Sequence, residues 1–73
     1  MTEPAHRTEI KLSHREQEIL TLVVAGMTNL EIANQLFISV NTVKTHINGI
    51  YNKTGLYNRV QVAIHAVRSQ LVE

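Results

Sequence analysis

The chain has 73 residues and no cysteine, which excludes a second domain, a disulfide framework and a thiolate zinc site, and suits a reducing cytoplasmic compartment. Its longest run without charged residues, 20–30, is far shorter than the roughly 20 apolar residues that span a bilayer, and its start lacks the apolar stretch of a signal peptide; we expect a soluble, non-secreted protein. The net charge is only +1, but residues 37–72 carry four basic residues and no acidic one, an asymmetry that suits a surface facing phosphates unless it is the chance outcome of few charges.

The first ten residues, 1–10, are polar, include the only proline and show no apolar periodicity. We expect a flexible tail there, followed by one domain at 11–73. Residues 13–16 read SHRE, the pattern of a capping box in which Ser13 and Glu16 satisfy free amides at a helix start. This predicts a first helix that runs to about Ala25 and ends at Gly26 in the left-handed conformation.

Three more helices are predicted from similar signals. A second capping box at 28–31 opens a short helix, Ser39 is a suitable N-cap for a third helix that ends before Gly55, and Asn58 can cap a fourth helix that reaches about Leu71. No alternating pattern with a two-residue turn predicts a β-hairpin. We therefore expect an all-α fold, a four-helix bundle whose second and third helices form a helix-turn-helix.

The third helix, about 40–53, carries a polar row that suits DNA bases. At about 100° per residue, the side chains that share this side are amides, a hydroxyl and an ammonium without any acid: Asn41, Lys44, Thr45, Asn48 and Asn52. The other side is apolar and should pack inward on the first two helices; it consists of Val40, Val43, Ile47, Ile50 and Tyr51. Lysine suits guanine, asparagine suits adenine, and threonine suits a polar edge or a thymine methyl group. We interpret this helix as the one that enters the major groove; an ordinary solvated face is the alternative.

Other residues are candidates for contacts to the DNA backbone, which position a protein without reading sequence. Free amides near Thr28 and Asn29 can bind a phosphate with the helix dipole. Thr42 and Lys53 lie on a flank of the third helix from which Lys53 can reach the backbone. Arg59 completes the predicted set.

Four strings of the chain resemble the LuxR/GerE-type helix-turn-helix, found at the C-terminus of NarL/FixJ response regulators and in short stand-alone regulators: LSHREQEIL (12–20), NLEIA (29–33), ISVNTVKTH (38–46) and KTG (53–55). The resemblance covers about 12–68. It implies a four-helix domain that regulates transcription and binds double-stranded DNA as a dimer, often through the fourth helix. It also implies base contacts at Lys44, Thr45 and Asn48, with backbone contacts at the following positions: Thr28, Asn29, Thr42 and Lys53.

The chain departs from this family at several positions. Leu30 replaces a frequent Lys or Arg, and Asn48 and Asn52 are neutral where basic residues are common, so we expect weaker binding with a shallower salt dependence. Gly49 lies in mid-helix at a cost of about 1 kcal/mol relative to alanine. The family usually has a larger polar residue there, so Gly49 marks a close approach to DNA or to a partner, or else a lost contact.

The fourth helix has two apolar sides. One stripe should complete the core, and it consists of Val60, Ala63, Ile64, Val67 and Leu71. The other side carries small residues, Val62, Ala66 and Ser69, which would let a second copy approach closely. We expect a homodimer through this second side that places the two recognition helices about 34 Å apart on a pseudo-palindromic operator. A merely tolerated surface is the alternative.

Competing functions are constrained by what the chain lacks. It has no aspartate or cysteine, and its four histidines show no mutual metal-ligand spacing, so we expect neither an enzyme nor a metal or other cofactor. A protein-interaction module stays open: a heterodimer partner or antagonist of another regulator with weak or no DNA binding, favoured by the low charge, Leu30 and Gly49. A piece resembling sigma-factor region 4 is opposed by GLYNR (55–59) and the full fourth helix. For a DNA-binding regulator we expect a cytoplasmic, nucleoid-associated location and RNA polymerase or another regulator as further partners.

Overall fold

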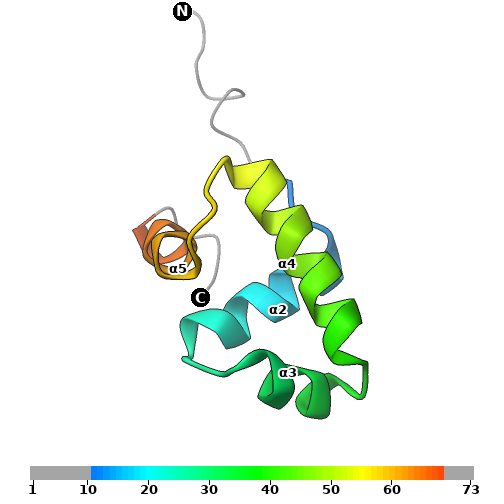
Figure 1. The fold of residues 1–73 in the computed structure, drawn as a ribbon. Coiled ribbons are helices and arrows are strands. Elements are labelled where there is room, and N and C mark those ends of the chain that lie inside the picture. Colours follow the sequence, from blue (N-terminus) through cyan, green and yellow to red (C-terminus); the bar gives the residue numbers. More distant parts are fainter. Residues whose placement is uncertain (1–10, 69–73) are drawn as a thin grey trace, which may run out of the picture.

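The computed structural model describes residues 11–68, which form four α-helices and contain no strand within that range. These are α2 (His14–Val24), α3 (Asn29–Leu36), α4 (Val40–Thr54) and α5 (Arg59–Arg68). α2 packs against each of the other three helices, and α3 packs against α4 (Figure 1). The predicted all-α fold with a helix-turn-helix, formed by α3 and α4, is confirmed. The predicted tail at 1–10 and the end of the fourth helix, including Ser69 and Leu71, lie outside the described residues.

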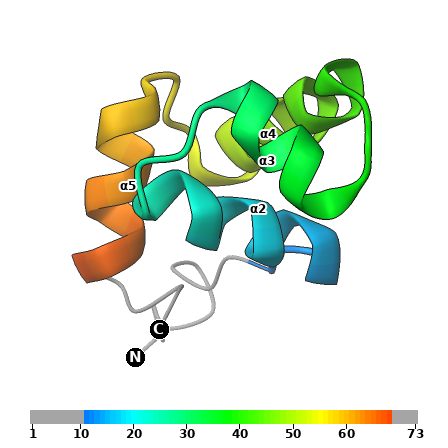
Figure 2. The ribbon, with the colours of Figure 1, turned by 90° about the horizontal axis from the view of Figure 1, so that it is seen from below.

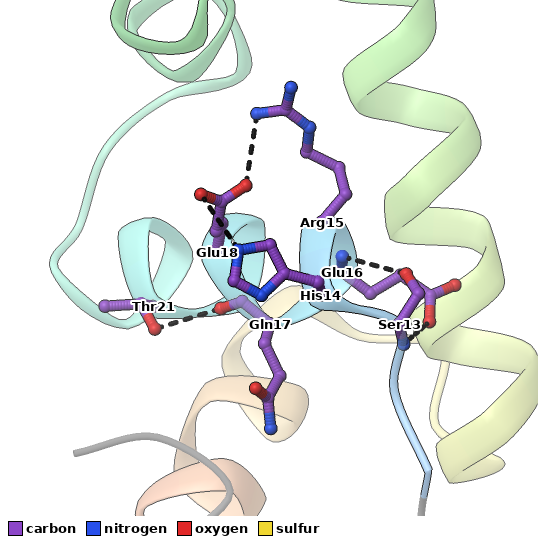
Figure 3. Close-up of polar contacts among 7 residues, drawn as sticks. All are labelled: Ser13, His14, Arg15, Glu16, Gln17, Glu18 and Thr21. Carbon is purple, nitrogen blue, oxygen red and sulfur yellow. Dashed lines mark hydrogen bonds and ion pairs between the residues drawn. The ribbon is translucent and has the colours of Figure 1, made fainter.

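The helix starts follow the predicted caps. In α2, the Ser13 hydroxyl accepts from the Glu16 amide (3.1 Å) while Glu16 Oε1 accepts from the Ser13 amide (2.9 Å), so both bonds of the capping box form (Figure 3). Thr28 and Glu31 make the same reciprocal pair at the start of α3. Ser39 Oγ accepts from the Thr42 amide at the start of α4.

The helix ends use left-handed residues at three places. Gly26 and Gly55 have φ angles of 91° and 75°, as predicted for stop positions that glycine occupies without steric cost. α3 ends instead at Phe37, which has φ 58° and is 93% exposed. A left-handed phenylalanine costs about 1 kcal/mol or more, and no local signal predicted this turn.

The core is formed by one apolar side of each helix. α2 contributes Ile19, Leu20 and Val23, and α3 contributes Ile32 and Ala33. From α4 come Val43, Ile47 and Ile50, as predicted for the inward side of that helix, whereas Val40 and Tyr51 are only partly buried and pack against this core. α4 is therefore fixed to the domain by its own valine and isoleucines, which leaves its opposite side toward solvent.

The predicted orientation of α5 is wrong. Val62 and Ala66, expected on an exposed dimer face, are 3% and 0% exposed and belong to the core. Val60, Ile64 and Val67, expected inside, are exposed. α5 lies beside the C-terminal end of α2 (Figure 2), and small side chains on the facing side let two helices approach closely. Periodicity reveals both apolar stripes but does not show which of them faces α2.

Candidate nucleic-acid interface

The polar row of α4 is exposed along its whole length. Asn41, Lys44, Thr45, Asn48 and Asn52 are all solvent-exposed. Lys44 takes part in none of the ion pairs formed within residues 11–68, so its ammonium group is available to an external acceptor. The Thr45 hydroxyl donates to the Asn41 carbonyl (3.0 Å), which leaves the hydroxyl oxygen free to accept another hydrogen bond. The structure thus brings together every residue that the sequence assigned to base contacts.

The start of α4 presents two hydroxyl groups. Ser39 Oγ lies 2.9 Å from Thr42 Oγ1 and also accepts from the Thr42 amide. Thr42 is half-buried and lies at the positive end of the helix dipole. Its hydroxyl is placed next to the polar row, at the end of α4 that adjoins the turn from α3.

The start of α3 gathers three of the predicted backbone-contact residues, one of which, Arg59, comes from a distant part of the chain. Arg59, the first residue of α5, donates from Nη1 to Asn29 Oδ1 (2.6 Å) and from Nη2 to the Met27 carbonyl oxygen (2.5 Å). Thr28 precedes Asn29 as the N-cap of α3. None of the ion pairs within the described residues involves Arg59, so its charge has no acidic partner there. The sequence predicted each residue but not their contact.

Lys53 is placed differently from the other predicted backbone residues. Its Nζ lies 2.7 Å from Oε1 of Glu16 on α2. Glu16 is only 7% exposed and is the one buried charged residue in the part of the chain that the structure describes. Burial raises the pKa of this carboxyl, but the hydrogen bond and charge of Lys53 and the bonds from Ser13 outweigh it and hold the pKa below its ordinary value. Sequence reasoning identified Glu16 as a cap and missed this second role.

Gly49 is explained by the same carboxylate. A Cβ atom added at Gly49 would overlap Glu16 Oε2. The close approach that a mid-helix glycine suggested is therefore an approach to Glu16 within the chain. α4 crosses α2 at this point, and the missing side chain leaves the room that the carboxylate occupies.

Three further features of the described part of the chain concern metal binding, membrane helices and grooves. Residues 11–68 contain no group of three or more His, Asp or Glu side chains placed to hold a metal ion. No helix among them is both long enough and apolar enough to cross a membrane. A shallow apolar groove runs between α2 and α5 and is lined by Val24, Ala63, Ile64, Val67 and Arg68.

Comparison with known proteins agrees with this geometry. Residues 10–66 match the family model described as bacterial regulatory proteins, luxR family. The chain is 49% identical over 61 residues to the transcriptional regulatory protein LiaR of Bacillus subtilis strain 168. The aligned region covers 84% of the chain and 29% of LiaR. It is 40% identical over 62 residues to the response regulator protein VraR of Staphylococcus aureus strain Mu3, with 85% of the chain and 30% of VraR covered.

Among solved structures, the response regulator ChrA of a heme-sensing two-component system superimposes with a TM-score of 0.82 at 40% identity. That match covers 92% of the chain and 35% of ChrA. The chain therefore spans only about a third of the length of these relatives.

Proposed function

Because the chain belongs to the luxR family of bacterial regulatory proteins, and so is a DNA-binding domain of transcription regulators, we propose that it recognises a specific double-stranded DNA sequence through α4 in the major groove. The observation that carries the proposal is the exposed, acid-free row on α4 above a buried apolar side. A helix so anchored presents its polar groups on a rigid support. The absence of acid matters because a carboxylate beside the phosphates would be repelled.

Base contacts are assigned to four residues of the row: Asn41, Lys44, Thr45 and Asn48. Lys44 can donate to O6 and N7 of guanine, and the asparagines can pair with N6 and N7 of adenine. Thr45 can offer its methyl group to thymine or its oxygen to an amino group. These side chains have the donors and acceptors that distinguish base pairs in the major groove.

Backbone contacts are assigned to Thr28, Asn29 and Arg59 at the start of α3, and to Thr42 at the start of α4. A cation beside a helix N-terminus is unfavourable by itself, because both are positive, and a phosphate relieves that repulsion. Arg59 lies at this place without an acidic partner in the described residues. Lys53, which we also expected in this set, is paired with Glu16 in the single chain.

The chain is proposed to act as a homodimer through the exposed stripe of α5, formed by Val60, Ile64 and Val67. These residues follow the i, i+4, i+7 spacing of one helix side and are open to solvent in the single chain. A two-fold dimer would place the two α4 helices about 34 Å apart on a pseudo-palindromic site. Sedimentation of the chain as a monomer, both free and bound to DNA, would contradict this part of the proposal.

Selection of bound sites from a random DNA pool tests the function. A specific regulator should enrich one sequence with two-fold related halves, whereas a non-specific binder should enrich none. We propose that the chain acts in the cytoplasm, at the nucleoid, where contact with RNA polymerase or another regulator converts DNA binding into altered transcription.

A second candidate is an interaction module that binds another regulator and not DNA. Two exposed apolar side chains at the ends of α3, Leu30 and Phe37, favour it because they lie outside the polar row of α4. A mobility-shift assay over a range of salt concentrations separates the two functions. A DNA-binding regulator gives a shift that weakens as salt rises, and a protein-only antagonist gives no such shift.

A further inference from the structure

Lys53 lies on a different side of α4 from the residues assigned to bases. At about 100° per residue, it is rotated by about 120° from Asn41 and the middle of the polar row. Its side chain runs toward α2, where Nζ meets Glu16 Oε1 at 2.7 Å. The Lys53 side chain is still 43% exposed, so solvent and other molecules can reach it.

The Glu16 carboxylate is held from three directions. Oε1 accepts from the Ser13 amide as well as from Lys53, and Oε2 occupies the room left by Gly49. Figure 3 shows the carboxylate turned toward Ser13 beside the ribbon of α4. A carboxylate restrained in this way is a preformed acceptor for Lys53. The pair joins residues 37 positions apart, so it exists only in the folded chain.

The charge of Lys53 is already neutralised within the protein. A lysine that replaces counterions on DNA contributes roughly −0.9 to the slope of log affinity on log salt, because one condensed cation is released. A lysine paired at 2.7 Å with a carboxylate adds no net positive charge toward the phosphates. Counting basic residues on this side of the domain therefore overestimates the number of phosphates that it neutralises.

We propose that Glu16 is a positioning residue that holds Lys53 away from the DNA backbone, so that Lys53 ties α4 to α2 instead of neutralising a phosphate. This inference rests on the proposed DNA-binding function. Glu16 lies on α2, a helix with no assigned DNA contact. The inference nevertheless gives this residue control over the strength and the salt dependence of DNA binding. Removing its charge releases a cation close to the DNA-binding helix.

The test measures DNA affinity against salt, from roughly 50 to 200 mM, for the whole chain and its selected DNA site. Lys53→Ala should leave the slope as in the wild type. Glu16→Gln should steepen the slope by about 0.9. A fourfold dilution of salt should then raise the DNA affinity of this variant by about 3.5-fold more than it raises that of the wild type. The double variant, Glu16→Gln with Lys53→Ala, should return to the wild-type slope, because the released cation is then absent.

Glutamine suits this experiment because it also completes a capping box, so the start of α2 keeps its bonds. Glu18→Gln is the matched control, since Glu18 lies on the same helix and pairs with His14 and Arg15, not with Lys53. Its slope should equal that of the wild type. Gly49→Ala gives a second route, because the new methyl group displaces the carboxylate while both charges remain, and it too should steepen the slope.

The outcomes separate the inference from the function. A slope that becomes shallower by about 0.9 in Lys53→Ala, with no change in Glu16→Gln, would show that Lys53 already contacts a phosphate and would overturn the inference. Unchanged slopes in Lys53→Ala, Glu16→Gln and Gly49→Ala, all folded by circular dichroism, would show that Lys53 is out of reach of DNA and would overturn it as well. A wild-type chain that binds no DNA at any salt concentration would refute the proposed function itself.

Discussion

Replacing Gly49 by alanine should fail to give the stability that alanine normally adds to a helix. Alanine is about 0.8–1.0 kcal/mol more favourable than glycine in a helix interior. Its methyl group, however, would overlap Glu16 Oε2 and force the carboxylate from its place. That movement weakens the bond to Ser13, worth about 1 kcal/mol, and the pair with Lys53, worth about 0.2–1 kcal/mol because Lys53 is 43% exposed. The free energy of unfolding should therefore stay level or fall by up to about 1 kcal/mol.

The same substitution should behave differently once Glu16 is shortened. In a Glu16→Ala background the methyl group meets no carboxylate, so Gly49→Ala should raise the free energy of unfolding by about 1 kcal/mol. Urea denaturation followed by circular dichroism on the four chains of this double-mutant cycle gives the coupling, expected at about 1–2 kcal/mol. In a Glu18→Ala background, Gly49→Ala should act as it does in the wild type. An equal gain of about 1 kcal/mol in all three backgrounds would refute the packing of Glu16 against Gly49.

Four further changes test other parts of the structure. Lys44→Ala should reduce discrimination between the selected site and its single-base variants by about 1–3 kcal/mol, measured by competition binding, and unchanged discrimination would remove Lys44 from the base contacts. Arg59→Ala should weaken binding to all DNA sequences and make the slope of log affinity on log salt shallower by about 0.9. The reason is that Arg59, unlike Lys53, has no acidic partner within the described residues. An unaltered slope would argue against a phosphate contact. Ile64→Glu should abolish the dimer in sedimentation while the chain stays folded, because Ile64 is exposed. Val62→Glu should unfold the chain, because Val62 is buried. Unfolding by Ile64→Glu and a folded Val62→Glu chain would contradict the orientation of α5. The free energy of unfolding should fall as pH drops below about 4.3, the ordinary glutamate pKa, and through the lower pKa of Glu16 in the folded chain, since a lowered pKa stabilises the fold only while the group is ionised. Thermal melts of Glu16→Gln should depend less on pH in that window. An equal dependence in this variant and the wild type would count against the pair of Glu16 with Lys53.

The parts of the fold that sequence predicts well depend on residues close together in the chain. Each capping box joins residues three positions apart, so the starts of α2 and α3 can be identified from Ser13 and Thr28 and the glutamates that follow them. The inward side of α4 follows from apolar spacing in the same way, and so does the exposed row on the other side. Local chemistry is enough for these elements because the groups involved meet as soon as the helix forms.

Contacts between distant residues could not be predicted in this way. Arg59 meets Asn29 across 30 positions and Lys53 meets Glu16 across 37, and no local pattern shows these distances. The orientation of α5 was mistaken for the same reason, because Val62 and Val60 are both apolar and only the packing on α2 distinguishes them. The left-handed turn at Phe37 was missed because phenylalanine gives no signal for that conformation.

The central claim is that the exposed row of α4 meets the bases of DNA, and amide chemical-shift mapping of the labelled chain titrated with its selected site tests it most directly. The largest changes should fall on residues 39–48 at the start and middle of α4, with a second group at Thr28 and Asn29. Changes confined to α2 and α5, with the amides of Lys44 and Asn48 unmoved at saturating DNA, would contradict it.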